Sequence, residues 1–299
     1  MALGYNLQSP GALQTKTQFP QIILTAMCLV VIQNNLQFEW ANVLYNLASL
    51  YSGLAASSTR TTTEGLKAAC NYYTSAAGVI KYLQEEVIPE LRSPPPEDMD
   101  SMSLEALEQL MLAQAQECFW QKAVTDGNRD VVVARLAEQV SEFYRAAEEF
   151  GTKGNAVPAE WIHRISAKQY HLAAAAQYRA SRDCLERSKY GEEITRLQVA
   201  LSHVKLAVVE GRYLNRAYLA DLMGFQSKLL EELKRANKDN DMIYLCESGY
   251  YLVTCKAACK AANTQIQHPS LPFPHYPPSK KPPGQNRTFP KRLQRLAIG

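Results

Sequence analysis

Acidic residues are absent from one end of this chain and almost absent from the other. Residues 1–37 contain one lysine and no Asp or Glu, and residues 246–299 contain eight basic residues and one acid, Glu247. The formal net charge of +3 over 299 residues therefore conceals a body, residues 38–245, with 23 basic and 28 acidic side chains. Because binding to phosphates requires a cationic face, we expect no nucleic acid partner for this body.

Long apolar runs are also missing, and glycine and proline are not abundant. The 14 Gly and 15 Pro, with 46% hydrophobic and 20% charged residues, exclude collagen, wholesale disorder and a disulfide scaffold. The apolar run at residues 22–32 is well short of the roughly 20 residues that span a bilayer. It also lacks the flanks of a signal peptide, since Lys16 is the only cation before it. We therefore expect a cytoplasmic protein with no membrane span.

Catalytic motifs are missing as well. The sequence contains no nucleophile elbow, Walker loop, dinucleotide-binding glycine motif or H-E-x-x-H pair. His163 and His171 fall about 12 Å apart along one predicted helix, too far to share a metal ion without further ligands. Cys70, Cys118 and Cys184 lie within apolar helical patterns, which favours buried reduced thiols. We expect no enzyme activity, no cofactor and no bound metal.

The pattern that is present is helical throughout residues 38–244. The first helix has apolar residues on one side at Val43, Leu44, Leu47, Leu50, Tyr51 and Leu54. The second has them at Leu66, Ala69, Cys70, Tyr73, Ala76, Ala77, Ile80 and Leu83, and Pro89 stops it. Five more helices are predicted at about residues 103–122, 129–150, 158–187, 192–210 and 215–237. No strand-like alternation occurs here, so the predicted fold class is all-α, an elongated antiparallel helical array with a TPR-like core.

Six stretches of this body carry more specific motifs. They are FEWANVLYNLASLYSGLA (38–55), EGLKAACNYYTSAAGVIKYLQEEVIPELRS (64–93), LMLAQAQECFWQKAV (110–124), AKQYHLAAAAQYRA (167–180), KYGEEITRLQ (189–198) and LKRANKDNDMIYL (233–245). In this order they resemble the Bro-one domain, the helical scaffold of ALIX and of other ESCRT-associated adaptors. The details SPPPEDMD, ECFWQKAV and DCLE look most like the PalA-type adaptors of the fungal ambient-pH response.

The resemblance implies a non-enzymatic adaptor of that signalling pathway, cytoplasmic and recruited to endosomes. Domains of this family bind the C-terminal amphipathic helix of an ESCRT-III subunit, of the Snf-seven or CHMP-four type, through an exposed apolar patch. Carried over position by position, the patch consists of Phe119, Val132 and Leu136. Lys67 matches a polar contact beside it, and Thr63 stands where ALIX has an acidic residue.

The residues alone leave two interpretations of the fourth helix open. Val132 and Leu136 are four residues apart and share a face, whereas Val133, Leu136 and Val140 form an equally regular inward stripe. The rival to the adaptor function is a generic helical-repeat interaction module with a different partner. An exposed apolar patch on the third and fourth helices is expected only for the adaptor.

The resemblance also divides the chain into three predicted parts. Residues 33–245 are a partial Bro-one domain, and residues 1–32 match poorly, with about 11–32 interpreted as translated intron. Residues 246–299 are predicted to be a disordered, basic, Pro-rich tail, because from His268 onward there are eight Pro, six Lys or Arg and no acid. The family's N-terminal lobe and V-shaped domain have no counterpart, so binding to Tyr-Pro-x-Leu motifs is not expected.

Overall fold

The computed structural model describes Leu24, residues 35–154 and residues 156–244, and every regular element in these residues is helical. The α-helices are α1 (Leu36–Ser57), α2 (Thr63–Tyr82), α3 (Ser101–Thr125), α4 (Asp130–Lys153), α5 (Ala159–Glu186), α6 (Tyr190–Gly211) and α7 (Arg216–Asp239). Short π segments η2 (Leu83–Val87) and η5 (Asn240–Tyr244) and 3-10 turns η3 (Ile88–Glu90) and η4 (Glu97–Met99) accompany them.

The chain divides into two units, residues 1–261 and residues 262–299. The second unit lies outside the described residues. The predicted disordered tail lies outside them too, as does the predicted insertion at residues 11–32 apart from Leu24.

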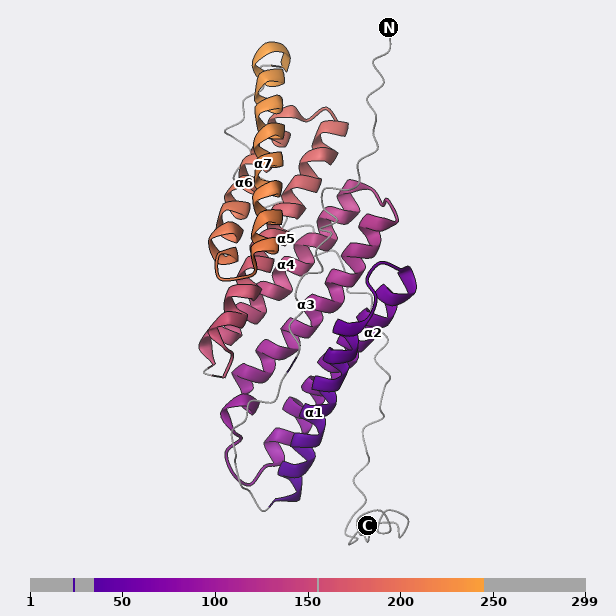
Figure 1. The fold of residues 1–299 in the computed structure, drawn as a ribbon, viewed down its shortest axis with the longest axis vertical. Coiled ribbons are helices and arrows are strands. Elements are labelled where there is room, and N and C mark those ends of the chain that lie inside the picture. Colours follow the sequence, from indigo (N-terminus) through magenta and orange to yellow (C-terminus); the bar gives the residue numbers. More distant parts are fainter. Residues whose placement is uncertain (1–23, 25–34, 155, 245–299) are drawn as a thin grey trace. The chain divides into compact units, whose positions relative to one another are not determined.

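The helices are stacked in chain order, each packing against the one that follows it (Figure 1). Loops of three to five residues join them, except that residues 83–100, which contain η2, η3 and η4, connect α2 to α3. Consecutive helices are antiparallel neighbours. The run Ala173–Ala176 is buried on α5, between α4 and α6, where small side chains allow close approach of the neighbouring helices. The all-α prediction is confirmed.

Side-chain caps fix several helix starts. The oxygens of Asn35, Thr62, Asp100 and Asn215 each accept a hydrogen bond from a backbone N–H in the first turn that follows, at 2.7–3.1 Å. Such a cap satisfies one of the donors that a helix start leaves unpaired and typically contributes about 1 kcal/mol. The predicted ranges of α3 to α7 agree with the observed ones to within three residues.

The apolar stripe predicted for the second helix is buried in full. All of its residues belong to the main core. The α-helical geometry ends at Tyr82 and is followed by η2 and by η3, which contains Pro89. All three predicted buried cysteines, Cys70, Cys118 and Cys184, are buried free thiols.

The stripe named from the sequence on α1 is, in contrast, largely exposed. Val43, Leu47, Leu50 and Leu54 have 55, 36, 66 and 47% of their surface exposed. The buried face of α1 is a different one, formed by Phe38, Ala41, Leu44, Tyr45, Ala48, Ser52 and Ala55. Three alanines spaced seven residues apart on that face permit close packing against α2. The stripe named from the sequence shares only Leu44 with this buried face, because large side chains weigh most in a periodicity pattern.

Leu24 also belongs to the buried side of α1. Only 1% of it is exposed, its N–H donates to Ser52 Oγ at 3.0 Å, and its carbonyl accepts from Ser49 Oγ at 2.5 Å. One residue of the segment interpreted as an insertion therefore joins the main core.

Candidate protein-binding surface

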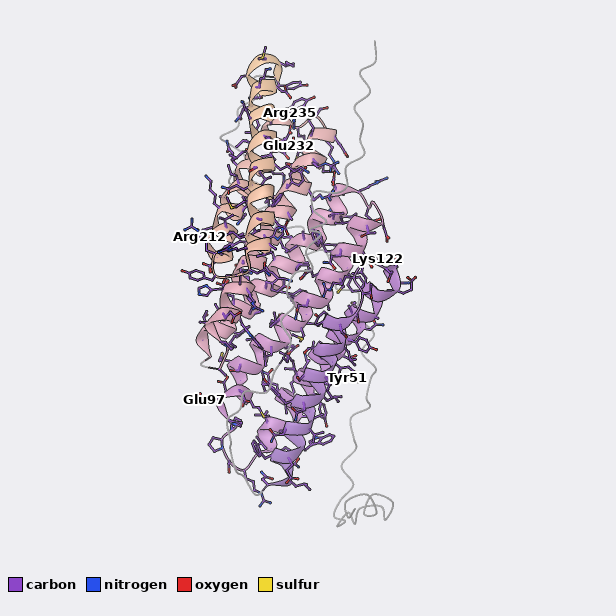
Figure 2. The ribbon with its side chains drawn as sticks, viewed as in Figure 1. Tyr51, Glu97, Lys122, Arg212, Glu232 and Arg235 are labelled. Carbon is purple, nitrogen blue, oxygen red and sulfur yellow. The ribbon has the colours of Figure 1, made fainter. Side chains whose placement is uncertain are left out.

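The five predicted patch residues lie on three adjacent helices, close to the start of α2, the end of α3 and the start of α4. Phe119 is six residues before the end of α3, and Leu136 is six residues after the start of α4. Each is thus about 9 Å from its helix end, which places the two at the same level of this antiparallel pair. Thr63 opens α2 and Lys67 follows one turn later. Lys122, labelled in Figure 2, marks this end of α3.

Exposure separates the residues of the patch from those of the core. Phe119 and Val132 have 44 and 41% of their surface exposed, while Val133 and Val140 are fully buried. Leu136 is half-buried and packs against the core from the edge. Of the two interpretations of α4, the inward stripe therefore runs through Val133 and Val140, and Val132 faces solvent.

The polar side of the surface rests on a tightly folded loop. Thr62 Oγ1 caps α2 by accepting from the Gly65 N–H at 3.1 Å. A Cβ atom at Gly65 would lie 1.8 Å from the carbonyl oxygen of Thr59, so only glycine permits the loop to fold back on the first turn of α2. This packing holds the half-buried Thr63 and the exposed Lys67 in place beside α3.

Arg60, in the same loop, reaches from the surface into the array. Its side chain is only 9% exposed, and its Nη1 atom lies 3.3 Å from Gln121 Oε1 on α3 and 3.9 Å from Glu117 Oε1. Its Nη2 atom donates to the Tyr73 hydroxyl of α2 at 3.5 Å. Arg60 therefore ties the start of α2 to the part of α3 that carries Phe119.

Behind the surface, Glu117 is the centre of a buried ionic cluster. It accepts from Lys168 Nζ of α5 at 2.7 Å and from the Tyr144 hydroxyl of α4 at 2.6 Å. Burial opposes the charged form of Glu117, but the two cations Lys168 and Arg60 together hold its pKa below the ordinary value. Burial likewise disfavours the charged form of Lys168 and lowers its pKa, although Glu117 acts in the opposite direction.

Sequence reasoning did not identify this cluster, although a signal was present. Glu117 and Lys168 are charges set within apolar helical stripes, next to Cys118 and Ala167. A buried charge is stable only when it is paired. A buried acid such as Glu117 and a buried base such as Lys168 are therefore predicted to contact each other.

Besides Glu117, α3 carries a second carboxylate with a shifted pKa, that of the partly buried Glu108. Glu108 is on the same face as Phe119, three turns earlier, and is 4.0 Å from Lys81 Nζ of α2. Burial raises its pKa to about 7; Lys81 lowers the pKa, and Glu105 and Glu85 raise it.

Glu108→Gln is expected to stabilise the protein at pH 8 and to leave its stability unchanged at pH 4. The folded state keeps the Glu108 proton up to about pH 7, whereas the unfolded chain releases it near the ordinary value of 4.5. Between these values the folded state binds more protons, so this group makes wild-type stability fall as pH rises. Urea unfolding at both pH values measures the effect. Equal stabilisation at pH 4 and pH 8 would contradict it.

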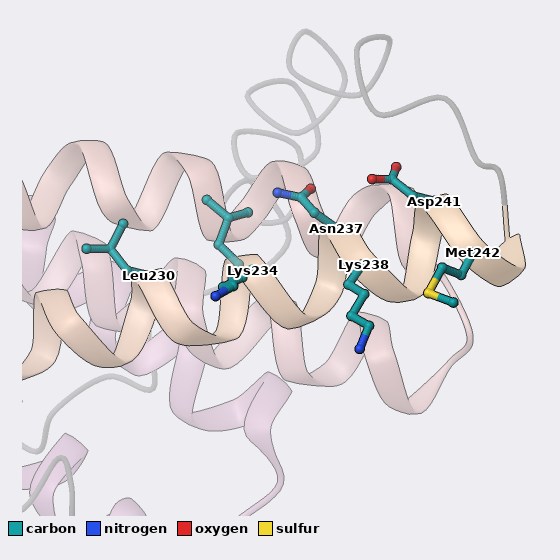
Figure 3. A pocket seen from close by; sticks show the side chains of 7 residues that line it. Leu230, Lys234, Asn237, Lys238, Asp241 and Met242 are labelled. Carbon is teal, nitrogen blue, oxygen red and sulfur yellow. The ribbon is translucent and has the colours of Figure 1, made fainter.

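A shallow hollow of about 530 Å³ lies elsewhere, on α7 and η5 (Figure 3). Its lining residues are Leu230, Leu233, Lys234, Asn237, Lys238, Asp241 and Met242. None of the five predicted patch residues contributes to it. Within the described ranges, no helix is long and apolar enough to cross a membrane.

The matching family model and the most similar curated proteins indicate the same family. The model of the BRO1-like domain matches residues 23–250. A pH-response regulator protein palA/RIM20 from Emericella nidulans is 58% identical over 215 residues, which are 72% of this chain and 25% of that protein. The palA/RIM20 protein of Saccharomyces cerevisiae is 33% identical over 231 residues, 76% of this chain and 32% of its own. The chain thus spans about a quarter to a third of the length of these curated relatives.

Solved structures agree with this result. The chain is similar to ALIX BRO1 in its complex with CHMP4C, with a TM-score of 0.67 and 32% identity over 73% of this chain and 60% of that one. A Bro1 domain described as a basis for endosomal targeting shares the fold with a TM-score of 0.64 at 21% identity, covering 73% of this chain and 59% of that one.

Proposed function

We propose a function that proceeds from one premise: the chain belongs to the BRO1-like domain family. The family resemblance carried by the six sequence motifs is thereby confirmed. The proposed function is a non-enzymatic adaptor of fungal ambient-pH signalling, recruited from the cytoplasm to endosomal membranes. It binds the C-terminal helix of an ESCRT-III subunit of the Snf-seven or CHMP-four type.

The observation that carries this proposal is the pair of exposed apolar side chains on α3 and α4. Phe119 and Val132 remain over 40% exposed at a helix–helix junction whose inner residues are fully buried. An amphipathic helix binds such a surface by placing its apolar face on a few anchors spaced along it. Leu136, at the level of Phe119, widens the apolar strip, and Lys67 offers a cation to acidic groups at the edge of the bound helix.

The relatives support the choice of partner and pathway. Curated relatives at 58 and 33% identity are named pH-response regulators. ALIX BRO1, at 32% identity, was solved in a complex with CHMP4C. Because this chain covers a fraction of the regulators' length, the proposal concerns the helical array alone, and binding of Tyr-Pro-x-Leu motifs is not part of it.

Calorimetric titration of the protein with an ESCRT-III C-terminal peptide tests the proposal. Wild type is expected to bind, and Phe119→Ala is expected to weaken binding about thirtyfold, because truncating an interface anchor typically costs 2 kcal/mol or more. Met223→Ala on α7 is the matched control, since Met223 is also about half exposed, at 53%, but lies away from the patch. The control should bind as wild type does.

Absence of wild-type binding would reject the proposed partner and leave a generic helical-repeat module with another ligand. Equal losses in Phe119→Ala and Met223→Ala would show that the effect does not come from the patch.

A further inference from the structure

A small cavity lies among the helices, away from the patch. Its volume is about 30 Å³. Its walls come from α1, η4, the start of α3, the loop that precedes α5, and α5 itself. The lining residues are Tyr45, Asp98, Ser103, Leu107, Ala156, Val157, Pro158 and Trp161.

Two oxygen atoms that belong to the walls of this cavity are unpaired. Asp98 Oδ1 and Ser103 Oγ have no hydrogen-bond partner among the residues that the structure describes. Only 8% of Asp98 and 1% of Ser103 is exposed, so bulk solvent does not hydrate them freely. Because the large majority of buried polar side-chain atoms in proteins have at least one partner, two unpaired oxygens around one cavity point to a bound molecule.

The carboxylate of Asp98 stands to gain most from such a molecule. Burial raises the pKa of Asp98, while hydrogen bonds from its own N–H and from the Met99 N–H act in the opposite direction. Burial also raises the pKa of Tyr45 to about 12, and the negative charge of Asp98 adds to that shift. Among the described residues, no cation offsets the burial of Asp98. A hydrogen-bond donor in the cavity would therefore stabilise the charged form of this carboxyl group.

The size and polarity of the cavity fit water. A buried water needs roughly 10–15 Å³ of space for its centre and two to four polar partners. The cavity offers about 30 Å³, an acceptor at Asp98 Oδ1 and a hydroxyl at Ser103 that donates or accepts.

A metal ion fits the same space poorly. Calcium takes six to eight oxygen ligands, and magnesium requires an octahedral set. One carboxylate and one or two hydroxyl groups do not supply such a set. The described residues also form no group of three or more His, Cys, Asp or Glu side chains that could hold a metal ion.

We propose that the cavity binds an ordered water molecule that bridges Asp98 and Ser103. The water donates a hydrogen bond to Asp98 Oδ1 and accepts one from the Ser103 hydroxyl. It thereby links η4, at the end of the long connection from α2, to the first turn of α3. No patch residue lines the cavity, so the inference is independent of the proposed function.

A crystal structure of the full chain, at a resolution that shows ordered water, tests the site directly. Density for one water is expected between Asp98 Oδ1 and Ser103 Oγ, about 2.5–3.0 Å from each oxygen. An empty cavity would overturn the proposal. Density with five or more oxygen neighbours, each within about 2.6 Å, would identify a metal ion and overturn it as well.

Ser103→Ala tests the site in solution through the sign of its effect on stability. With the water bound, the variant removes one of the partners of that water. The urea midpoint of unfolding is then expected to fall by roughly 0.3–1 M, the shift produced by losing one typical hydrogen bond. In a dry cavity, the same variant removes an unpaired buried hydroxyl group, so the midpoint should rise.

Ser181→Ala is the matched control for replacing a buried helical serine by alanine. Ser181 is 2% exposed, but its hydroxyl donates to the Tyr178 carbonyl of its own helix at 2.7 Å. This local bond does not depend on a cavity, and its loss should shift the midpoint little. If the midpoint of Ser103→Ala equals or exceeds that of Ser181→Ala, the bridging water is refuted. None of these measurements involves the ESCRT-III peptide, so the proposed function stands or falls by its own titration.

Discussion

Val132→Asp is expected to abolish binding of the ESCRT-III C-terminal peptide while leaving the thermal unfolding of the protein unchanged. Val132 is 41% exposed in the first turn of α4, so a carboxylate there stays hydrated in the free protein. In the complex, the same carboxylate would lie under the apolar face of the bound helix. It must then lose its water without gaining a partner, or hold the helix away.

The loss is expected to be at least ~30-fold in affinity, the typical minimum for disabling an anchor of an interface. Titration calorimetry measures it, and circular dichroism of the same samples reports stability. Wild-type affinity in Val132→Asp would remove Val132 from the binding surface and favour the generic helical-repeat module.

Val133→Asp is the informative control because it makes the same change one residue along the chain. Val133 is 1% exposed and packs in the core between α4 and its neighbours. An unpaired carboxylate there should unfold the protein rather than only weaken binding. The two adjacent variants thus separate a surface role from a core role without reference to any partner.

The α4 helix shows which features of such a surface can be predicted from sequence and which cannot. The pattern of apolar residues located the helix within three residues, but residues 131–133 are all valine and give no sign of which one points outward. Their orientation depends on how α3 and α5 pack on the two sides of α4, which is a property of the tertiary structure. The family resemblance, not the periodicity, placed Val132 in the patch.

The same limit explains α1. Two apolar stripes run along it, one with alanines every seven residues and one with larger side chains. Periodicity alone favours the larger side chains, whereas close packing against α2 selects the small ones. A helix such as α2, which packs between α1 and α3, buries its predicted stripe in full, whereas among the described elements α1 packs mainly against α2 and η2.

The buried ionic cluster leads to a second large expected effect on stability. Lys168→Met is expected to lower the free energy of unfolding by about 3–5 kcal/mol, because removing one partner of a buried ion pair leaves the other charge uncompensated. Lys168 Nζ lies 2.7 Å from Glu117 Oε2, and both side chains are at least 93% buried. Arg60 Nη1, at 3.9 Å from the other carboxylate oxygen, is too distant to replace it fully.

Urea unfolding followed by circular dichroism measures the effect, with Lys153→Met as a matched control. Lys153 also pairs with a glutamate, Glu149, at 2.7 Å, but its side chain is 54% exposed, so its loss should change stability by no more than about 0.5 kcal/mol. A double variant, Lys168→Met with Glu117→Gln, should recover part of the loss because it removes the stranded charge. If Lys168→Met and Lys153→Met cost the same, the cluster contributes no more than a surface ion pair. If the double variant is no more stable than Lys168→Met, the loss comes from packing around the lysine stem and not from the buried carboxylate.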